Sequence, residues 1–309
     1  MRTLALPLSL SLMLSLTLAL AGCQTPTPAL PASAPTVEKQ VRVNDTDIRY
    51  VEQGQGVPVV FVHGSMSDQR VWEAYRPQVA ARYRYIAVNQ RYFGAQPWAD
   101  SGARFSQPTH AADLAAFIQG LGAGPVHVVA WSYGGSVATL AASQHPELFS
   151  TLTLHEPTIG SLIAGTPEGK AAIAAFGGEV GRIRAVANGG DTSAAMRQFW
   201  EFVLKLPPGG FDTEPAAVQR MVLDNQRTVQ LTLNAPPQPI SCEMVGAIRA
   251  PALVTVGADT RPLWTLSAAA WQRCAAKAEL ATILNSNHDA VVRSPHAFAA
   301  LLMPFLARH

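Results

Sequence analysis

A serine between a strand-like run and a helix-like run is the strongest chemical signal in the sequence. In the stretch VVAWSYGGSVATLAA, Ser132 follows a short apolar run and has small residues around it at Ala130, Gly134 and Gly135. A sharp strand-to-helix turn holds such a serine in a strained backbone conformation, and small neighbours are needed because larger side chains would collide with the turn. We therefore predict that Ser132 is a nucleophile.

A serine nucleophile needs a general base within hydrogen-bonding reach. His288 lies in NSNHDA, in a short loop between the last strand-like run and a final helix that is expected to begin near Pro295. The other histidines lie in expected strands, at helix ends or at the terminus, where a hydrogen-bonded or solvated imidazole is the commoner role. The sequence thus predicts His288 as the base of Ser132.

The base in turn needs a buried carboxylate that fixes its tautomer and stabilises the imidazolium. Two acidic residues follow strand-like runs at suitable places: Glu156 ends STLTLHE, and Asp259 ends PALVTVGAD. The residues alone leave Glu156 and Asp259 both open as this acid.

Two backbone N–H groups are candidates for stabilising a developing oxyanion. Ser65 follows His63-Gly64 directly after a buried strand-like run, and Tyr133 begins the helix after Ser132, where the first N–H groups have no intrahelical partner. We predict these two N–H groups as the oxyanion hole and a structural role for His63.

The elements that must position these residues alternate between short β-rich runs and longer helical stretches. After an expected hairpin with its turn at Asn44-Asp45, the strand-like runs are VPVVFVHG, YRYIAVN, PVHVVAWS, STLTLHE, PALVTVGAD and ELATILN. This pattern predicts an α/β fold with a doubly wound, mostly parallel sheet, and sites lie at the carboxyl ends of such strands. The rhythm stops over 157–239, which predicts an inserted helical cap between core segments 41–156 and 240–309.

The order of these motifs resembles the α/β-hydrolase superfamily. The chain carries FVHGSMSD, NQRYFG, AWSYGG, LTLHEP, PALVTVGAD and NSNHDA in that order over nearly all of residues 41–309. It departs from the superfamily at Ala130, where Gly is usual, and in NQRYFG, where Asp-x-Arg-Gly-x-Gly is common. In the superfamily the acid often ends a Gly-x-x-Asp string, a position held here by Thr260. Glu156 resembles the acid of relatives in which it has moved to the end of the strand after the nucleophile helix. This resemblance favours Glu156 as the acid and leaves Asp259 as the alternative.

The N-terminus predicts export. Residues 1–22 combine an early Arg with a Leu- and Ser-rich apolar run, and LAGC resembles the lipobox of bacterial lipoproteins, in which Cys23 becomes acylated. Residues 23–40 are rich in Pro, Thr and Ala and predict a flexible tether. Gln24, in place of the Asp associated with inner-membrane retention, favours the outer membrane facing the periplasm. In that oxidising compartment, Cys242 and Cys274 could pair or stay two separate thiols.

These residues together predict acyl transfer by a serine hydrolase of the cell envelope. A small to medium apolar ester, cleaved through an acyl-enzyme, is the expected substrate, with amides, thioesters and carbon–carbon bonds left open. A non-catalytic binding lipoprotein is the alternative. A carboxylate nucleophile is needed for haloalkane or epoxide chemistry, so Ser132 argues against both.

A net charge of +2 without a basic run disfavours nucleic acid as a partner. The absence of phosphate-loop, dinucleotide or metal-ligand patterns predicts no cofactor and no metal.

The apolar residues of the expected cap leave two interpretations open. Phe199, Trp200, Phe202 and Phe211 could line an apolar pocket over the site, or they could only pack the cap onto the core.

Overall fold

The structure, a computed structural model, describes residues 37–98 and 100–309. The predicted signal peptide over 1–22, the predicted lipidation site Cys23 and the first part of the predicted tether lie outside the described residues. Among the described helices, none combines the length and the apolar character needed to cross a bilayer.

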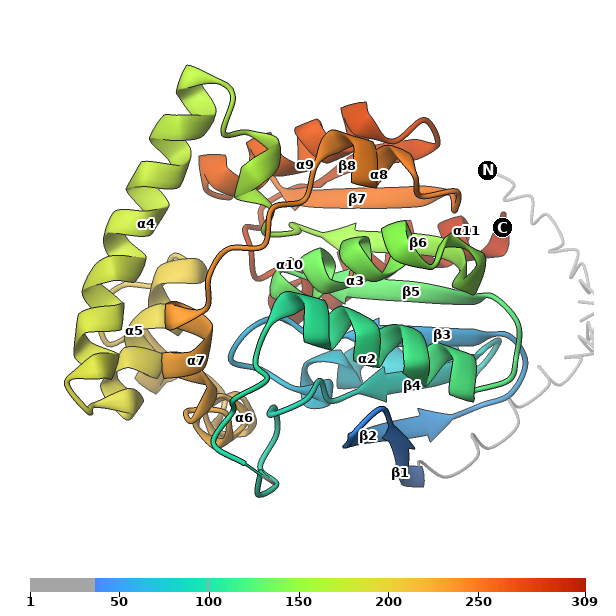
Figure 1. Ribbon diagram of the computed structural model, residues 1–309, viewed down its shortest axis with the longest axis horizontal. Helices are drawn as coiled ribbons and strands as arrows, with labels where there is room; N and C mark the ends of the chain where they lie inside the picture. The colour runs from blue at the N-terminus through green and yellow to red at the C-terminus, as the bar shows by residue number, and fades with distance from the viewer. Residues whose placement is uncertain (1–36, 99) are drawn as a thin grey trace, which may run out of the picture. The chain divides into compact units, whose positions relative to one another are not determined.

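Within the described residues, one eight-stranded sheet forms the centre of the fold, in the order β1-β2-β4-β3-β5-β6-β7-β8 (Figure 1). The strands from β4 to β8 pair in parallel, and β1 and β2 add an antiparallel edge. This confirms the predicted α/β fold with a mostly parallel sheet. The strands are β1 Val37–Val43, β2 Thr46–Gln53, β3 Pro58–Val62, β4 Arg84–Val88, β5 Val126–Trp131, β6 Phe149–His155, β7 Ala252–Gly257 and β8 Ala278–Ile283.

The first strand begins earlier than the sequence indicates. The tether was expected to run to residue 40, but β1 starts at Val37 and pairs with β2 from Val37 opposite Glu52 to Val43 opposite Thr46. The first four side chains of β1 are exposed, so no apolar pattern marks them. Backbone pairing at a sheet edge defines this strand, and the hairpin turn falls at Asn44-Asp45 as predicted.

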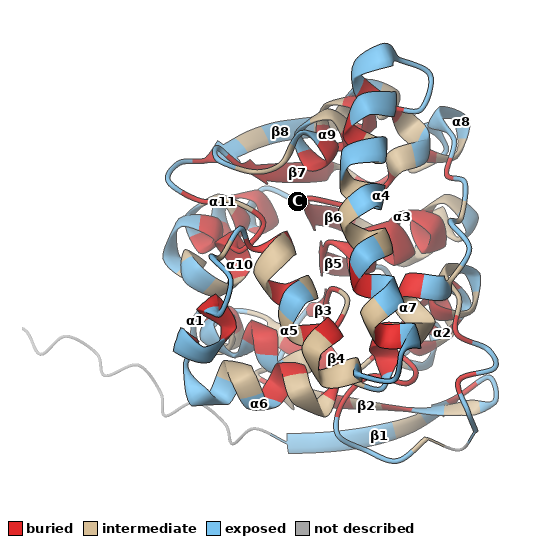
Figure 2. Ribbon diagram, turned by 90° about the vertical axis from the view of Figure 1, so that its left-hand side faces the viewer, coloured by how far each residue is buried: buried red, intermediate tan, exposed pale blue. Residues whose placement is uncertain are grey.

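Helices cover both faces of the sheet, which explains why its strands read as continuous apolar runs. Along β3, Val60 and Val62 belong to the core cluster on the side of α2 and α3, whereas Val59 and Phe61 belong to the cluster on the opposite side, with α10 and α11. Figure 2 shows the resulting buried layers along β3, β5, β6 and β7. These helices are α1 Arg76–Ala80, α2 Gln107–Gly120, α3 Tyr133–Gln144, α8 Cys242–Gly246, α9 Pro262–Cys274, α10 Ala290–Arg293 and α11 Pro295–Ala307.

The segment between β6 and β7 is helical, and it gathers at one end of the sheet (Figure 1). It contains α4 Pro167–Asn188, α5 Thr192–Val203, α6 Ala216–Asp224 and α7 Thr228–Asn234. Trp200 and Phe211 are fully buried in the cluster that joins this cap to the core. Short 3₁₀ helices complete the described chain: η1 Gln69–Tyr75, η2 Pro146–Leu148, η3 Gly160–Leu162 and η4 Gly210–Thr213.

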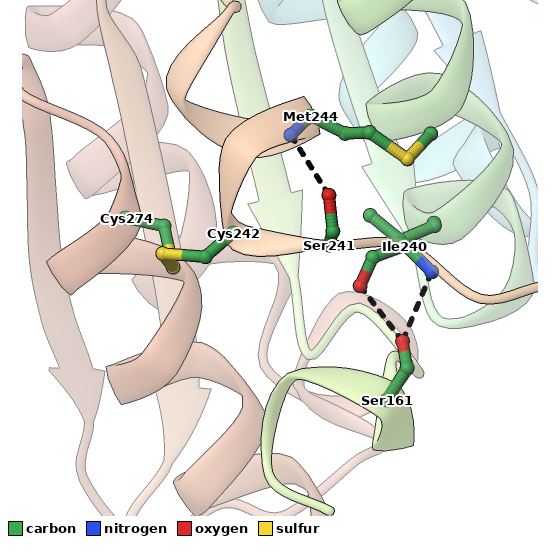
Figure 3. Close-up of a disulfide and its surroundings, with 6 residues drawn as sticks. All are labelled: Ser161, Ile240, Ser241, Cys242, Met244 and Cys274. Atoms are coloured by element: carbon green, nitrogen blue, oxygen red, sulfur yellow. Dashed lines mark hydrogen bonds between the residues drawn. A yellow bond between two sulfur atoms is a disulfide. The ribbon is translucent and has the colours of Figure 1, made fainter. Parts of the chain in front are cut away.

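The two chain crossings between core and cap are tied together. Ser161, near the start of the cap, donates its hydroxyl to the carbonyl of Ile240 at 2.9 Å and accepts the N–H of Ile240 at 3.0 Å. Two residues further on, Cys242 forms a disulfide with Cys274 at the end of α9 (Figure 3). The two thiols that the sequence left unassigned are therefore one bridge, and it fastens the segment that returns from the cap, at the start of α8, to the end of α9.

Candidate active site

The turn at Ser132 joins β5 to α3 in a backbone conformation that few residues adopt. Ser132 has φ +55° and ψ −118°, the strained region expected of an exposed nucleophile. A Cβ at Gly134 would lie 2.3 Å from the carbonyl oxygen of His63, so only glycine fits there. Ala130 is fully buried between Val62 and Leu154 on the neighbouring strands, and its methyl group is accommodated.

A continuous hydrogen-bonded chain links three of the predicted residues. The Nε2 atom of His288 lies 2.9 Å from the Oγ of Ser132, and its Nδ1 lies 2.7 Å from the Oε2 of Glu156. Glu156 also accepts the N–H of Gly257 and the hydroxyl of Thr260, each at 2.7 Å. The three residues come from the ends of β5 and β6 and from the loop after β8, and all are at least nine-tenths buried.

The electrostatics of Glu156 set the tautomer of His288. Burial alone raises the pKa of the Glu156 carboxyl, but the hydrogen bond from His288, the neighbouring His155 ring and the Gly257 N–H together hold that pKa below its usual range. Glu156 is therefore an ionised acceptor, and Nδ1 of His288 carries the hydrogen between them. The lone pair of Nε2 then faces the hydroxyl of Ser132, as a general base requires.

Asp259, the alternative acid, does not reach His288. It is exposed on the turn after β7, where its peptide N–H bonds to the carbonyl of Ser286 and its own carbonyl accepts the Lys205 ammonium. Thr260 lies at the position where the superfamily often has its acid, and its hydroxyl donates to the carboxylate of Glu156 at the end of β6.

The two predicted oxyanion donors face the same cavity as Ser132. Ser65 and Tyr133 both line it, and neither peptide N–H has an acceptor among the described residues. A Cβ at Gly64 would lie 3.2 Å from the Cβ of Ser132, so the Ser65 loop runs directly beside the serine. His63 holds this loop, because its Nδ1 bonds to the Gly64 carbonyl at 2.7 Å and its Nε2 accepts the N–H of Gln90 at 3.1 Å.

The cavity above Ser132 is small and uncharged. Its volume is about 170 Å³, below the roughly 300–1,000 Å³ of pockets that hold drug-sized ligands. Phe199 lines it, so one of the cap aromatics weighed in the sequence contributes to the pocket wall, while Trp200 and Phe211 pack the cap. The other cap residues in the wall include Phe176, Val180, Val203, Thr232 and Leu233. A hollow of about 200 Å³ beside the β1–β2 hairpin is lined by charged residues and contains no member of the triad.

Two residues next to the triad carry no signal in the sequence. Thr158 directly follows Pro157 at the start of the cap, and Trp264 lies in the first turn of α9. Their side chains contact each other and the catalytic pair, as described below. No sequence spacing of a single threonine and a helical tryptophan indicates that they lie beside Ser132 and His288. Their contacts depend on how α9 packs over the sheet.

The composition of the site limits what it can hold. Across residues 37–98 and 100–309, there is no group of three or more His, Cys, Asp or Glu side chains placed to bind a metal ion. The arrangement of a buried acid, an oriented imidazole and a strained serine is suited to nucleophilic attack followed by general acid transfer.

Comparison with known families agrees with the fold. Residues 59–301 match the family model described as alpha/beta hydrolase family, and the chain belongs to this family. It is similar to the pimeloyl-(acyl-carrier protein) methyl ester esterase of Aeromonas hydrophila, with 35% identity over 32% of this chain and 37% of that esterase. It is also similar to a haloalkane dehalogenase of Mesorhizobium japonicum, with 30% identity over 39% of this chain and 38% of that enzyme. The matched region thus spans less than half of these curated relatives.

Solved structures reproduce the fold over much more of the chain. An esterase of Exiguobacterium antarcticum superposes with a TM-score of 0.73 and 18% identity, covering 88% of this chain and 100% of that one. A thermophilic esterase of Thermogutta terrifontis superposes with a TM-score of 0.67 and 21% identity, covering 89% and 99%. At these identities the likeness establishes the fold.

The two candidate acids are separated by matched substitutions. Glu156→Gln removes the charge that orients His288, so we expect hydrolytic kcat/KM to fall by about 10³–10⁴-fold. Asp259→Asn should leave it within about two-fold, because the exposed Asp259 does not contact the base. Steady-state kinetics of both variants measure this difference, and a larger loss in Asp259→Asn than in Glu156→Gln would assign the acid to Asp259.

Buried histidines around the site make the fold sensitive to acid. Burial lowers the pKa of His63 to about 4, of His155 to about 4 and of His110 to about 3. Between about pH 6.5 and these folded-state pKa values, the histidines bind protons in the unfolded chain but not in the folded chain. The free energy of unfolding therefore falls as pH falls. We expect a loss on the order of 1–2 kcal/mol per buried histidine between about pH 7 and pH 5 in urea titrations.

One variant pair isolates this effect. His110→Gln should flatten the pH dependence of the free energy of unfolding, whereas the same change at the exposed His296 should leave its slope as in the wild type. Equal slopes in all three proteins would mean that groups other than the buried histidines govern the acid sensitivity.

Proposed function

We propose that this protein is a serine hydrolase that cleaves a small to medium, uncharged carboxylic ester through an acyl-enzyme. The observation that carries the proposal is the unbroken hydrogen-bonded chain from Glu156 through His288 to Ser132, which ends in an apolar cavity. Similar proteins that are named as esterases support the proposal. Their names state the activity of those proteins and not of this chain.

The reaction would run in two halves. In the first, Nε2 of His288 takes the proton of Ser132 as Oγ attacks the ester carbonyl, and the N–H groups of Ser65 and Tyr133 stabilise the oxyanion. The imidazolium, stabilised by Glu156, then protonates the leaving alcohol, and the acyl group remains on Ser132. In the second half, His288 deprotonates a water molecule that attacks the acyl-enzyme, and the Ser132 oxygen leaves with the proton held by His288.

Other chemistries of the family fit less well. A haloalkane dehalogenase and an epoxide hydrolase are among the relatives, but their reactions need a carboxylate nucleophile at the position that Ser132 occupies here. Amides, thioesters and carbon–carbon bonds share the acyl-transfer mechanism and are the neighbouring alternatives. A binding lipoprotein without activity is the remaining one, and it would have no need for a hydrogen-bonded triad.

Covalent labelling and turnover test the proposal together. We expect a fluorophosphonate to modify Ser132 and the protein to hydrolyse p-nitrophenyl acetate or butyrate faster than the palmitate ester, because the cavity is small. Ser132→Ala should lose both reactions, with turnover falling by several orders of magnitude. A wild-type protein that is inert to the esters and to the fluorophosphonate would favour the binding lipoprotein.

We further propose that the chain is a lipid-anchored protein of the bacterial cell envelope, facing the periplasm from the outer membrane. The lipobox-like sequence ending at Cys23 supports this location, and so does the Cys242–Cys274 disulfide, since such bonds persist in oxidising compartments.

Fractionation of bacterial cells tests this location. Full-length protein should be recovered with the outer membrane, and Cys23→Ala should release it from the outer-membrane fraction because the acylation site is lost. Ser132→Ala is the matched control and should stay membrane-bound. Recovery of Cys23→Ala in the same fraction as the wild type would argue against lipid anchoring.

A further inference from the structure

Trp264 contacts His288 directly and reaches Ser132 through the side chain of Thr158. The indole of Trp264 lies face to face with the imidazole of His288, with ring centroids 3.7 Å apart and planes 12° apart. Its Nε1 donates to the Oγ1 of Thr158 at 3.0 Å, and Thr158 Oγ1 lies 3.3 Å from the Oγ of Ser132. Trp264 and His288 are only 1% and 2% exposed, so their stacked rings are shielded from solvent.

The position of Thr158 is fixed by its backbone as well as by Trp264. Its peptide N–H donates to the carbonyl of Ser132 at 3.3 Å, and its own carbonyl accepts the hydroxyl of Ser136 at 2.8 Å. Both partners belong to the strand-to-helix turn. The threonine hydroxyl is therefore held beside the nucleophile by the same turn that presents the nucleophile.

Counting hydrogens assigns the direction of the contact between the two hydroxyls. The single hydroxyl hydrogen of Ser132 points to Nε2 of His288, because Nδ1 of that ring carries the hydrogen shared with Glu156. The indole N–H of Trp264 can only donate, so it occupies a lone pair of Thr158 Oγ1. The one hydrogen left for the 3.3 Å contact belongs to Thr158, which donates to the Oγ of Ser132. This distance is long for a hydroxyl pair, as catalytic hydrogen bonds often are before substrate binds.

We propose that Trp264 is a positioning residue that stabilises the imidazolium form of His288, and that Thr158 is a further catalytic residue that donates a hydrogen bond to the Oγ of Ser132. This inference rests on the proposed hydrolase function and extends it.

The reason for the first role is the charge that His288 gains in each half-reaction. The face of an indole attracts a cation, and the attraction is stronger where water is excluded. The titratable groups that face His288 are Glu156, which bonds to it, His155, whose ring lies 6.3 Å away, and the adjacent Asp289, which pairs with Arg293. Changes at Trp264 leave all of these in place.

The reason for the second role is the oxygen that must leave when the acyl-enzyme breaks down. In that step the bond between the acyl carbon and Ser132 Oγ breaks, and Oγ takes the proton from His288. A donor already directed at Oγ stabilises the negative charge that develops there. The same donor acts in the first half, because Oγ becomes negatively charged as it loses its proton to His288, and the contact keeps the serine in the rotamer that attacks.

The same helix provides a matched control. Trp271, also in α9 and fully buried, donates its Nε1 to the Oγ1 of Thr139 at 3.1 Å, without contacting the triad. It thus repeats the indole–threonine hydrogen bond about two turns away from the site. Trp271→Phe and Thr139→Val report the effect of losing such a bond on the fold alone.

The experiment uses the full-length protein and compares Trp264→Phe, Trp264→Leu, Thr158→Val and Thr158→Ser with the two controls. The readouts are the pH profile of kcat/KM for p-nitrophenyl butyrate and the rate of fluorophosphonate labelling, which needs no ester substrate. Thr158→Val and Trp264→Phe should each lower both rates by about 5–10-fold, Thr158→Ser should restore them to within about two-fold, and the controls should stay within about two-fold of the wild type.

The two aromatic variants separate stacking from hydrogen bonding. Trp264→Phe keeps an aromatic face and should leave the acidic limb of the kcat/KM profile where it is. Trp264→Leu removes that face, so the imidazolium form is less stable and the acidic limb should move to lower pH by about half a unit to one unit.

Each outcome bears on the inference. Unchanged rates in Thr158→Val, or equal losses in the Trp271 and Thr139 controls, would overturn the role of Thr158. An acidic limb that stays fixed in Trp264→Leu would overturn the role of Trp264, while the proposed function would stand on Ser132→Ala. If the wild type labels at Ser132 but hydrolyses no ester, the ester proposal fails and the labelling rates still decide the inference. If it does neither, both fail.

Discussion

The structure depends on keeping one carboxylate ionised inside the protein. Glu156 is fully buried, and an isolated charge at such a place is costly because the low-dielectric interior replaces its water shell poorly. Three donors offset that cost: the Gly257 N–H at the end of β7, the Thr260 hydroxyl and the His288 ring. Each comes from a different position around the edge of the sheet, so the charge holds together the loops that form the site.

The parallel sheet makes this convergence possible. Ser132 and Glu156 both follow strands directly, and both have positive φ, at +55° and +46°, which side chains other than glycine seldom adopt. The peptide N–H of Ser132 bonds to the carbonyl of His155, and that of Glu156 to the carbonyl of Thr255 on the next strand. The ladder therefore continues through both strained residues, and the rigidity of the sheet maintains conformations that the isolated chain would abandon.

Much of the fold was predictable because apolar runs and small residues report on burial and close approach. The six core strands, the helical insertion, Ser132 and His288 follow from such local patterns, whereas the preference for Glu156 over Asp259 rests on its resemblance to relatives. The residues Thr158 and Trp264 do not, because their contacts arise from the packing of α9 and the cap against the ends of the strands. Cys242 and Cys274 are 32 residues apart, and no local rule relates such a separation to distance in space. The start of β1 was missed for a different reason, since an edge strand needs backbone partners but no buried side chains.

The tie between Ser161 and Ile240 also has a meaning for how proteins of this architecture diversify. The cap leaves and rejoins the core at two points held together by one serine side chain, so it behaves as an insertion whose ends meet. A segment with adjoining ends can be lengthened, shortened or replaced by another without rethreading the sheet. Thr158 is one of the few cap residues that precede this junction, and it is bonded to the strand-to-helix turn. Exchange of the segment beyond Ser161 would change the wall of the cavity and leave the reacting residues and their neighbour in place, which makes the junction a natural boundary for recombination between relatives.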